Sequence, residues 1–276
     1  MLTVPRRAHP ARRARARVLA VVAVAAVALG GCTTLPDPTV TTSGSGPDPT
    51  ATTTVPAAPS SVELTDMLDR STTLTLSDGV VRVGDGTLGR GSSTVTATFT
   101  SATATLTVPA PGSARWEVEQ DGSAVLVDDS VPEVGGMTPP VARDAANATL
   151  RTDVLADGDA IEVSLLPRSA TLFPVTVTFD LATSALERAV WAKNLEGGRS
   201  LQTFPTAFGR SGSQAALSAV RIALVAAEPE AASSVMDKQL RCHALGAPTK
   251  ESWNLEPWRP DVGYMDYLLA RCNPAP

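Results

Sequence analysis

The sequence is poor in the residues that most enzymes use for acid–base or metal chemistry. It holds two histidines and three cysteines among 276 residues, and His243 is the only histidine after residue 31. A closed site of cysteine and histidine ligands for zinc is therefore not expected, and we predict neither a metal nor a cofactor. The chain beyond residue 31 also lacks the GxSxG, HExxH and SxxK motifs of hydrolases. The sequence thus favours a non-enzymatic role, although it leaves catalysis open.

Positive charge is scarce outside the first 31 residues. That segment holds six of the 23 basic residues and none of the 28 acidic residues, so the rest of the chain carries 17 basic and 28 acidic residues, a formal charge of −11. Because a phosphate backbone is bound by a basic face, we do not expect nucleic acid as a partner. Hydrophobic residues make up 43% of the chain and charged residues 18%, which is enough for a packed core.

Residues 1–31 predict a lipoprotein signal peptide. Six arginines precede an unbroken apolar stretch from Val18 to Leu29, which has the length of a signal-peptide core and is too short to span a bilayer. The stretch leads into a Leu-Gly-Gly-Cys sequence that has the pattern of a lipobox, with Cys32 as the residue that accepts the lipid. We therefore expect lipidation of Cys32. The alternative is an ordinary signal peptide that contains a cysteine.

A lipid on Cys32 would hold the protein at the extracytoplasmic face of the cell membrane. Residues 33–62 contain six prolines and many threonines with almost no large apolar side chain, so residues 32–62 are predicted to form a lipidated tether rather than a folded domain. The expected partners are the membrane, through the anchor, and a cell-wall glycan, a peptide or an envelope protein.

The two remaining cysteines, Cys242 and Cys272, form an even pair in an oxidising compartment. We expect a disulfide between them, which would close a loop of about 30 residues and stabilise the fold by roughly 3–4 kcal/mol on the chain-entropy model. Two free thiols, or half of a metal site, are the alternatives.

The fold class predicted from the pattern of the sequence is α+β, in two domains. Residues 63–180 favour an antiparallel, sandwich-like β domain, because short β-branched runs alternate with turn sequences such as Ser-Asp-Gly and Asp-Gly. The predicted strands cover residues 74–76, 80–83, 94–99, 102–108, 124–127, 148–155, 160–166 and 175–179. A GxGxxG pattern begins at Gly84, but a strand follows it rather than a helix, so it indicates a hairpin turn and not a dinucleotide site.

Residues 181–276 predict a small α+β domain. Two strands, 188–193 and 200–204, are expected around a Gly-Gly turn, and helical patterns follow. Ser213 is expected to cap a helix that ends at Pro229, with Leu217, Val220 and Leu224 on its inner face. Further helices are predicted over residues 231–242, with Val235, Met236 and Leu240 inward, and over residues 262–270.

Three motifs stand near the end of the chain. A D-x-Q-x-x-C-H motif runs from Asp237 to His243, a W-x-L-E-P-W-R-P motif from Trp253 to Pro260, and a C-N-P motif begins at Cys272. Together they resemble the DUF2599 family of uncharacterised secreted bacterial domains, and the resemblance covers roughly residues 181–274. Since members of this family lack an established reaction, the resemblance implies a secreted domain and no particular activity.

The W-x-L-E-P-W-R-P segment is the candidate binding surface. Its two prolines stiffen the backbone, and Trp253, Glu256, Trp258 and Arg259 offer indole faces and charges to a glycan or a peptide. The structural alternative is that the tryptophans fill the core of the disulfide-closed loop, sealed by an ion pair of Glu256 with Arg259 or Lys250.

His243 is the candidate catalytic residue, as a general base oriented by Glu256 or Asp261. A hydrolase acting on an envelope polymer is therefore the alternative function, and it requires His243 to lie within hydrogen-bond reach of a carboxylate in an open cleft. A structural histidine, hydrogen-bonded to the backbone, is the simpler interpretation. The leading hypothesis is a non-enzymatic envelope lipoprotein whose C-terminal domain binds a partner. A third hypothesis assigns the contact to the β domain instead.

Overall fold

The computed structural model describes residues 59–67, 70–130, 134–195 and 197–275. The predicted signal peptide, Cys32 and most of the predicted tether therefore lie outside the described residues. Among the helices that the structure describes, none has the length and apolar character needed to cross a membrane.

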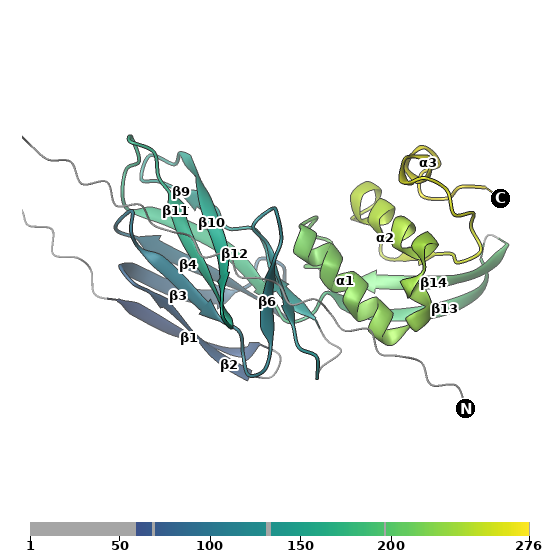
Figure 1. The fold of residues 1–276 in the computed structure, drawn as a ribbon, viewed down its shortest axis with the longest axis horizontal. Coiled ribbons are helices and arrows are strands. Elements are labelled where there is room, and N and C mark those ends of the chain that lie inside the picture. The colour runs from purple at the N-terminus through teal and green to yellow at the C-terminus, as the bar shows by residue number, and fades with distance from the viewer. Residues whose placement is uncertain (1–58, 68–69, 131–133, 196, 276) are drawn as a thin grey trace, which may run out of the picture. The chain divides into compact units, whose positions relative to one another are not determined.

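The described residues from 60 to 182 form mostly antiparallel strands (Figure 1). Their bounds are β1 (Ser60–Met67), β2 (Arg70–Leu76), β3 (Gly79–Asp85), β4 (Ser92–Phe99), β5 (Thr105–Pro109), β6 (Arg115–Val118), β7 (Ala124–Val127), β8 (Gly135–Met137), β9 (Val141–Arg143), β10 (Thr149–Asp157), β11 (Ala160–Leu166) and β12 (Val175–Ala182). The expectation of a mostly antiparallel β region is confirmed.

Strand β10 connects two groups of strands. Residues 151–157 of β10 pair with β11, and the strand order continues through β5 and β2 to β1. Residues 149–150 of β10 pair with β9. From β9 the strand order continues through β12 and β4 to β3. Side chains alternate between buried and more exposed positions along these strands, as in β11 and β4, because successive residues of a strand point to opposite faces. The buried faces of both groups share one core, exemplified by Leu106, Ile161, Phe99 and Val177.

Four strands in this region were not predicted, and the bounds of several predicted strands differ by a few residues. Strand β1 begins at Ser60, within the segment expected to be tether, since its few apolar residues give no clear alternation. Strands β6, β8 and β9 are only three or four residues long, which is too short to carry a periodic signal. The GxGxxG pattern forms the β3–β4 hairpin connection, where Gly86 N–H donates to Ser92 O over 3.2 Å.

The C-terminal part contains a three-stranded antiparallel sheet and three α-helices (Figure 1). The elements are β13 (Leu186–Leu195), β14 (Gly198–Pro205), α1 (Gln214–Ala227), a 3-10 helix (Pro229–Ala232), α2 (Ser234–Gly246), β15 (Trp253–Leu255) and α3 (Tyr264–Leu269). Helices α1 and α2 lie on one side of β13 and β14, where Val220, Leu240, Leu201 and Trp253 share a second core.

The predicted helices are present, with local differences in their bounds and in the burial of their side chains. The second begins at Ser234 rather than at residue 231, because Pro229 starts a 3-10 turn and Ser233 Oγ accepts from Met236 N–H to cap the α-helix. Ser213 caps α1 as expected, accepting from Ala216 N–H over 3.1 Å. Leu217, which was expected on the inner face, is only half-buried.

The turn between β6 and β7 contacts the start of helix α1, within one compact unit. Asp121 Oδ2 accepts from Gln214 N–H and Ser123 Oγ accepts from Ala215 N–H, both over 2.9 Å. Two of the N–H groups that a helix leaves unbonded at its first turn are thereby satisfied by a hairpin almost 100 residues earlier. The pKa of Asp121 is lowered, because the hydrogen bonds from Ser123 and Gln214 outweigh the opposing effect of burial.

Candidate functional site

Three of the four candidate binding residues lie in the interior. The exposed fraction is 0% for Trp253, 1% for Glu256 and 9% for Arg259. Strand β15 causes this burial, because Leu255 pairs with Leu201 and Trp253 with Thr203 on β14. Trp258 is half-buried and is the only one of the four with a substantial exposed surface. The geometry therefore corresponds to the packing alternative for this segment, and a binding role for these side chains stays a prediction.

Glu256 is the centre of a buried polar network. Its Oε1 accepts from Ser200 Oγ over 2.9 Å, and its Oε2 accepts from Arg259 Nε over 2.5 Å. Arg259 Nη1 also donates to Pro274 O over 3.3 Å. A buried carboxylate is tolerated when an opposite charge and further hydrogen bonds compensate its lost hydration. The network links strand β14, the segment after β15 and the last residues of the chain.

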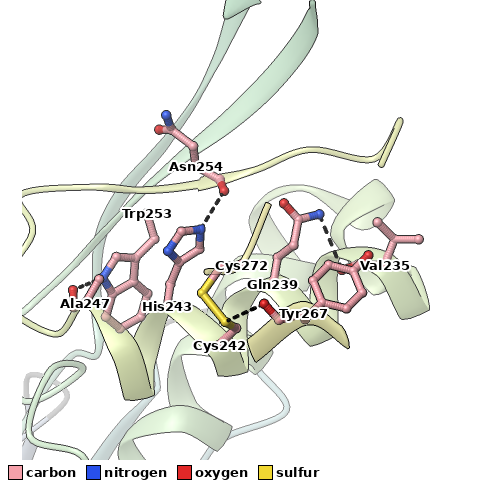
Figure 2. The surroundings of a disulfide bond; sticks show 9 residues. All are labelled: Val235, Gln239, Cys242, His243, Ala247, Trp253, Asn254, Tyr267 and Cys272. Atoms are coloured by element: carbon pink, nitrogen blue, oxygen red, sulfur yellow. Dashed lines mark hydrogen bonds between the residues drawn. A yellow bond between two sulfur atoms is a disulfide. The ribbon is translucent and has the colours of Figure 1, made fainter. Parts of the chain in front are cut away.

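Both tryptophans of the motif have defined structural contacts. Trp253 Nε1 donates to Ala247 O over 3.0 Å, just beyond the end of α2 (Figure 2). The guanidinium of Arg259 lies 4.3 Å from the ring centroid of Trp258. The ring of Trp258 also packs against Gly198, where an added Cβ would come within 2.3 Å of Trp258 Cδ1. The absence of a side chain at residue 198 thus allows the indole to approach the β13–β14 hairpin.

His243 is buried, with an exposed fraction of 5%. Its Nε2 lies 3.1 Å from Asn254 O (Figure 2); because a carbonyl oxygen only accepts, this nitrogen carries the proton. Of the two carboxylates proposed to orient it, Glu256 is bonded to Ser200 and Arg259, and Asp261 pairs with Lys238. These contacts favour a structural histidine and give no support to a base in an open cleft.

The sulfur atoms of Cys242 and Cys272 lie 2.07 Å apart, at the distance of a disulfide (Figure 2). The pair connects α2 to the turn that follows α3. Tyr267 of α3 is buried beside it, and its hydroxyl donates to Pro260 O over 2.9 Å. Burial, and secondarily the negative charge of Asp261, raises the pKa of Tyr267 above its ordinary value.

A groove of about 550 Å³ opens between the start of α1, the end of α2 and the start of α3. No pattern in the sequence predicts this groove. Its lining residues are Gly209, Arg210, Ser211, Gly212, Ser213, Gln214, Leu217, Arg241, Ala244, Leu245, Pro248 and Tyr264. None of these described residues is a His, Cys, Asp or Glu, so the groove offers no acid, base or thiol for catalysis. Its lining combines apolar side chains with the positive charges of Arg210 and Arg241.

Arg210 fixes one wall of the groove. Its guanidinium donates to four carbonyl oxygens, those of Pro205, Pro248, Lys250 and Glu251. The loop after α2 is therefore held against the segment after β14. The opposite wall, formed by α3, is tied to α2 through Cys242 and Cys272. Both walls are thus connected to neighbouring segments of the domain by several hydrogen bonds or by the disulfide.

The described residues also offer no cluster of metal ligands. Among the described residues no group of three or more His, Cys, Asp or Glu side chains gathers as metal ligands would. The C-terminal part is thus a small α+β domain with a pair of cysteines at disulfide distance and a groove between its helices.

Comparisons with known proteins agree with this class. Residues 186–275 match the model of a family described as a protein of unknown function, DUF2599. Uncharacterized proteins of Mycobacterium bovis and of two strains of Mycobacterium tuberculosis are each 40% identical over 83 residues, which is 27% of this chain and 56% of each relative. The chain thus spans about half the length of the curated relatives it matches. No solved structure matches.

Proposed function

We propose that the protein is a lipid-anchored lipoprotein of the extracytoplasmic membrane face, and that its C-terminal domain binds a component of the cell envelope without catalysis. The observation that carries the binding role is the groove between α1, α2 and α3, which combines half-exposed apolar side chains with two arginines and contains no acid or base. In this proposal the buried motif residues position the walls of the groove, and they do not themselves contact the partner.

The burial of the motif supports such a positioning role. Trp253 binds the end of α2 through Ala247 O, next to Pro248 of the groove wall. The ring of Trp253 in turn lies 5.5 Å from the guanidinium of Arg210. A change at Trp253 would therefore alter the groove indirectly, through the loop that Arg210 holds.

The anchor is tested by mass spectrometry of the protein purified from membranes. A diacylglyceryl group on Cys32 and absence of residues 1–31 are expected, and Cys32→Ser should release the protein into the medium. An unmodified Cys32 on a membrane-associated protein would contradict the anchor. The pattern that supports the proposal is the apolar stretch followed by Leu-Gly-Gly-Cys.

Binding is tested with the secreted Cys32→Ser form of the full chain, added to isolated cell wall and to isolated membranes. Retention should fall at least fivefold in Leu245→Asp, because a charge would enter the apolar floor of the groove. Leu172→Asp is the matched control, since Leu172 is 55% exposed in the β region and lies outside the groove. Equal retention of wild type and Leu245→Asp, with Trp258→Ala reducing it instead, would move the binding surface to the tryptophan motif.

A further inference from the structure

We propose that the ligand of this groove is a peptide segment of a partner protein, in which an acidic side chain lies next to an aliphatic one. This inference rests on the proposed function, because it names the partner of the same site. Its three arguments are the charge of the groove, the exposure of its apolar residues and its open form.

The charge of the groove is positive on a protein that is otherwise acidic. Its only charged lining residues are Arg210 and Arg241, whereas the chain beyond residue 31 carries a formal charge of −11. The hydrogen bonds of Arg210 that the structure shows go to carbonyl oxygens, which do not neutralise its charge. Complementary charge on the ligand must therefore be negative.

Arg241 is the cation able to reach a ligand. Its side chain is 57% exposed, and its Nη1 lies 4.0 Å from Asp237 Oδ2, the limit of an ion pair. The other oxygen of Asp237 is 2.7 Å from Arg221 Nε, so Asp237 is held mainly by Arg221. The Arg241 guanidinium also lies 5.9 Å from the ring centroid of Tyr264. A ligand carboxylate could thus be bound at the edge of the apolar floor.

The apolar floor is formed by Leu217, Ala244, Leu245 and Tyr264. Leu245 is 68% exposed, although it lies at the end of a helix that otherwise turns apolar side chains inward. Covering it with an aliphatic side chain would remove apolar surface from water. The floor and Arg241 together select a ligand with an aliphatic group next to an anionic one.

The open form of the groove favours a peptide over a lipid. An acyl chain is apolar along its whole length and needs an enclosed cavity, whereas a peptide buries one face and keeps its polar backbone toward water. One rim of the groove is a polar loop, in which Ser211 Oγ and Ser213 Oγ lie 3.1 Å apart around Gly212. Ser213 is buried and its Oγ caps α1, so the exposed Ser211 is the hydroxyl at the rim that can bond to a peptide amide.

The experiment is a selection from a random library of displayed 12-residue peptides on the immobilised Cys32→Ser protein. We expect enrichment of sequences that combine Asp or Glu with Leu, Ile or Val. Synthetic peptides from the selection should bind at least tenfold more weakly to Arg241→Glu and to Leu245→Asp. Arg241→Lys should keep most of the affinity, and Arg188→Glu, a change at an exposed arginine of β13, should leave it unchanged.

Enrichment of basic peptides, or selected peptides that bind both groove variants as well as wild type, would overturn the inference. So would a selection without enrichment, and in that case binding to phosphatidylglycerol vesicles or to decanoate would identify a lipid as the ligand. Loss of retention on isolated cell wall by Leu245→Asp, despite a failed peptide selection, would leave the proposed function standing and refute only the peptide.

Discussion

The side-chain amide of Gln239 is paired in both directions with the backbone of Glu256. Gln239 Nε2 donates to Glu256 O over 2.9 Å, and Glu256 N–H donates to Gln239 Oε1 over 3.0 Å. Both residues are buried. The Gln239 side chain on helix α2 thus makes the two backbone hydrogen bonds that a neighbouring strand would make with this segment. These bonds fix the position of the segment relative to α2.

We expect Gln239→Ala to be destabilising, because it leaves the buried N–H of Glu256 without its partner, whereas the carbonyl of Glu256 keeps the hydrogen bond from Arg259 N–H over 3.2 Å. An unsatisfied buried group costs about 1–3 kcal/mol, so the free energy of unfolding should fall by about that amount. Urea denaturation measures it. Gln202→Ala, at a half-exposed position of β14, is the matched control and should change stability by less than about 0.5 kcal/mol. Equal effects at the two positions would show that the paired amide has no special role.

The ion pair of Glu256 and Arg259 should show strong coupling in a double-mutant cycle. Removing one partner leaves a buried charge without compensation, which typically costs about 3–5 kcal/mol, whereas replacing both can be nearly neutral. Glu256→Leu and Arg259→Leu should each destabilise the protein by about that amount. The double variant should lose clearly less than the sum. Additive losses would mean that the two side chains contribute independently of each other.

Gly198→Ala should displace the indole of Trp258. An added Cβ would lie 2.3 Å from Trp258 Cδ1, closer than any real contact, and overpacking of this kind costs about 1–3 kcal/mol. The emission maximum of tryptophan fluorescence should shift as the ring of Trp258 becomes more exposed. Gly84→Ala is the control, since an added Cβ meets nothing within 4 Å there. An unchanged spectrum and stability would show that the ring adapts without cost.

The sequence predicts the elements of this fold better than it predicts exposure. Ser213 and Pro229 mark the ends of α1, and they can be read from the sequence because helix capping and helix termination depend on neighbouring residues. The burial of Trp253 and Arg259 depends on β15, a strand of three residues that forms only because β14 is beside it. The groove could not be predicted either, because Leu217 and Leu245 belong to different helices and become neighbours only through tertiary packing.

Stability should depend on pH through Asp121, whose pKa is lowered in the folded state. A lowered pKa means that the ionised form stabilises the fold at pH values above the ordinary carboxyl pKa of about 3.9, and that this contribution is lost as the pH falls through the folded-state pKa. Below pH 4 the free energy of unfolding should fall more steeply in wild type than in Asp121→Asn. At neutral pH, Asp121→Asn should cost about 1 kcal/mol or less, since Asp121 is exposed.

The control for this titration is Asp129→Asn, since the Asp129 side chain is 86% exposed and pairs with the half-exposed Arg115. Its unfolding curve should follow wild type over the same pH range. If Asp121→Asn and wild type lose stability in parallel, the bond from Gln214 N–H to Asp121 does not depend on the charge of the carboxylate.

The disulfide should control both the stability of the C-terminal part and the shape of the groove. Cys242 and Cys272 are 30 residues apart, so Cys242→Ser together with Cys272→Ser should lower the free energy of unfolding by roughly 3–4 kcal/mol on the chain-entropy model. Reducing the wild-type protein should produce the same loss, whereas the reductant should not affect the double variant. Because the bond also ties α3 to α2, and Tyr264 of α3 lines the groove, the double variant should bind the selected peptides more weakly while it remains folded. Full affinity in the folded double variant would mean that the contact between α2 and α3 positions Tyr264 without the bond, and that the disulfide serves stability alone.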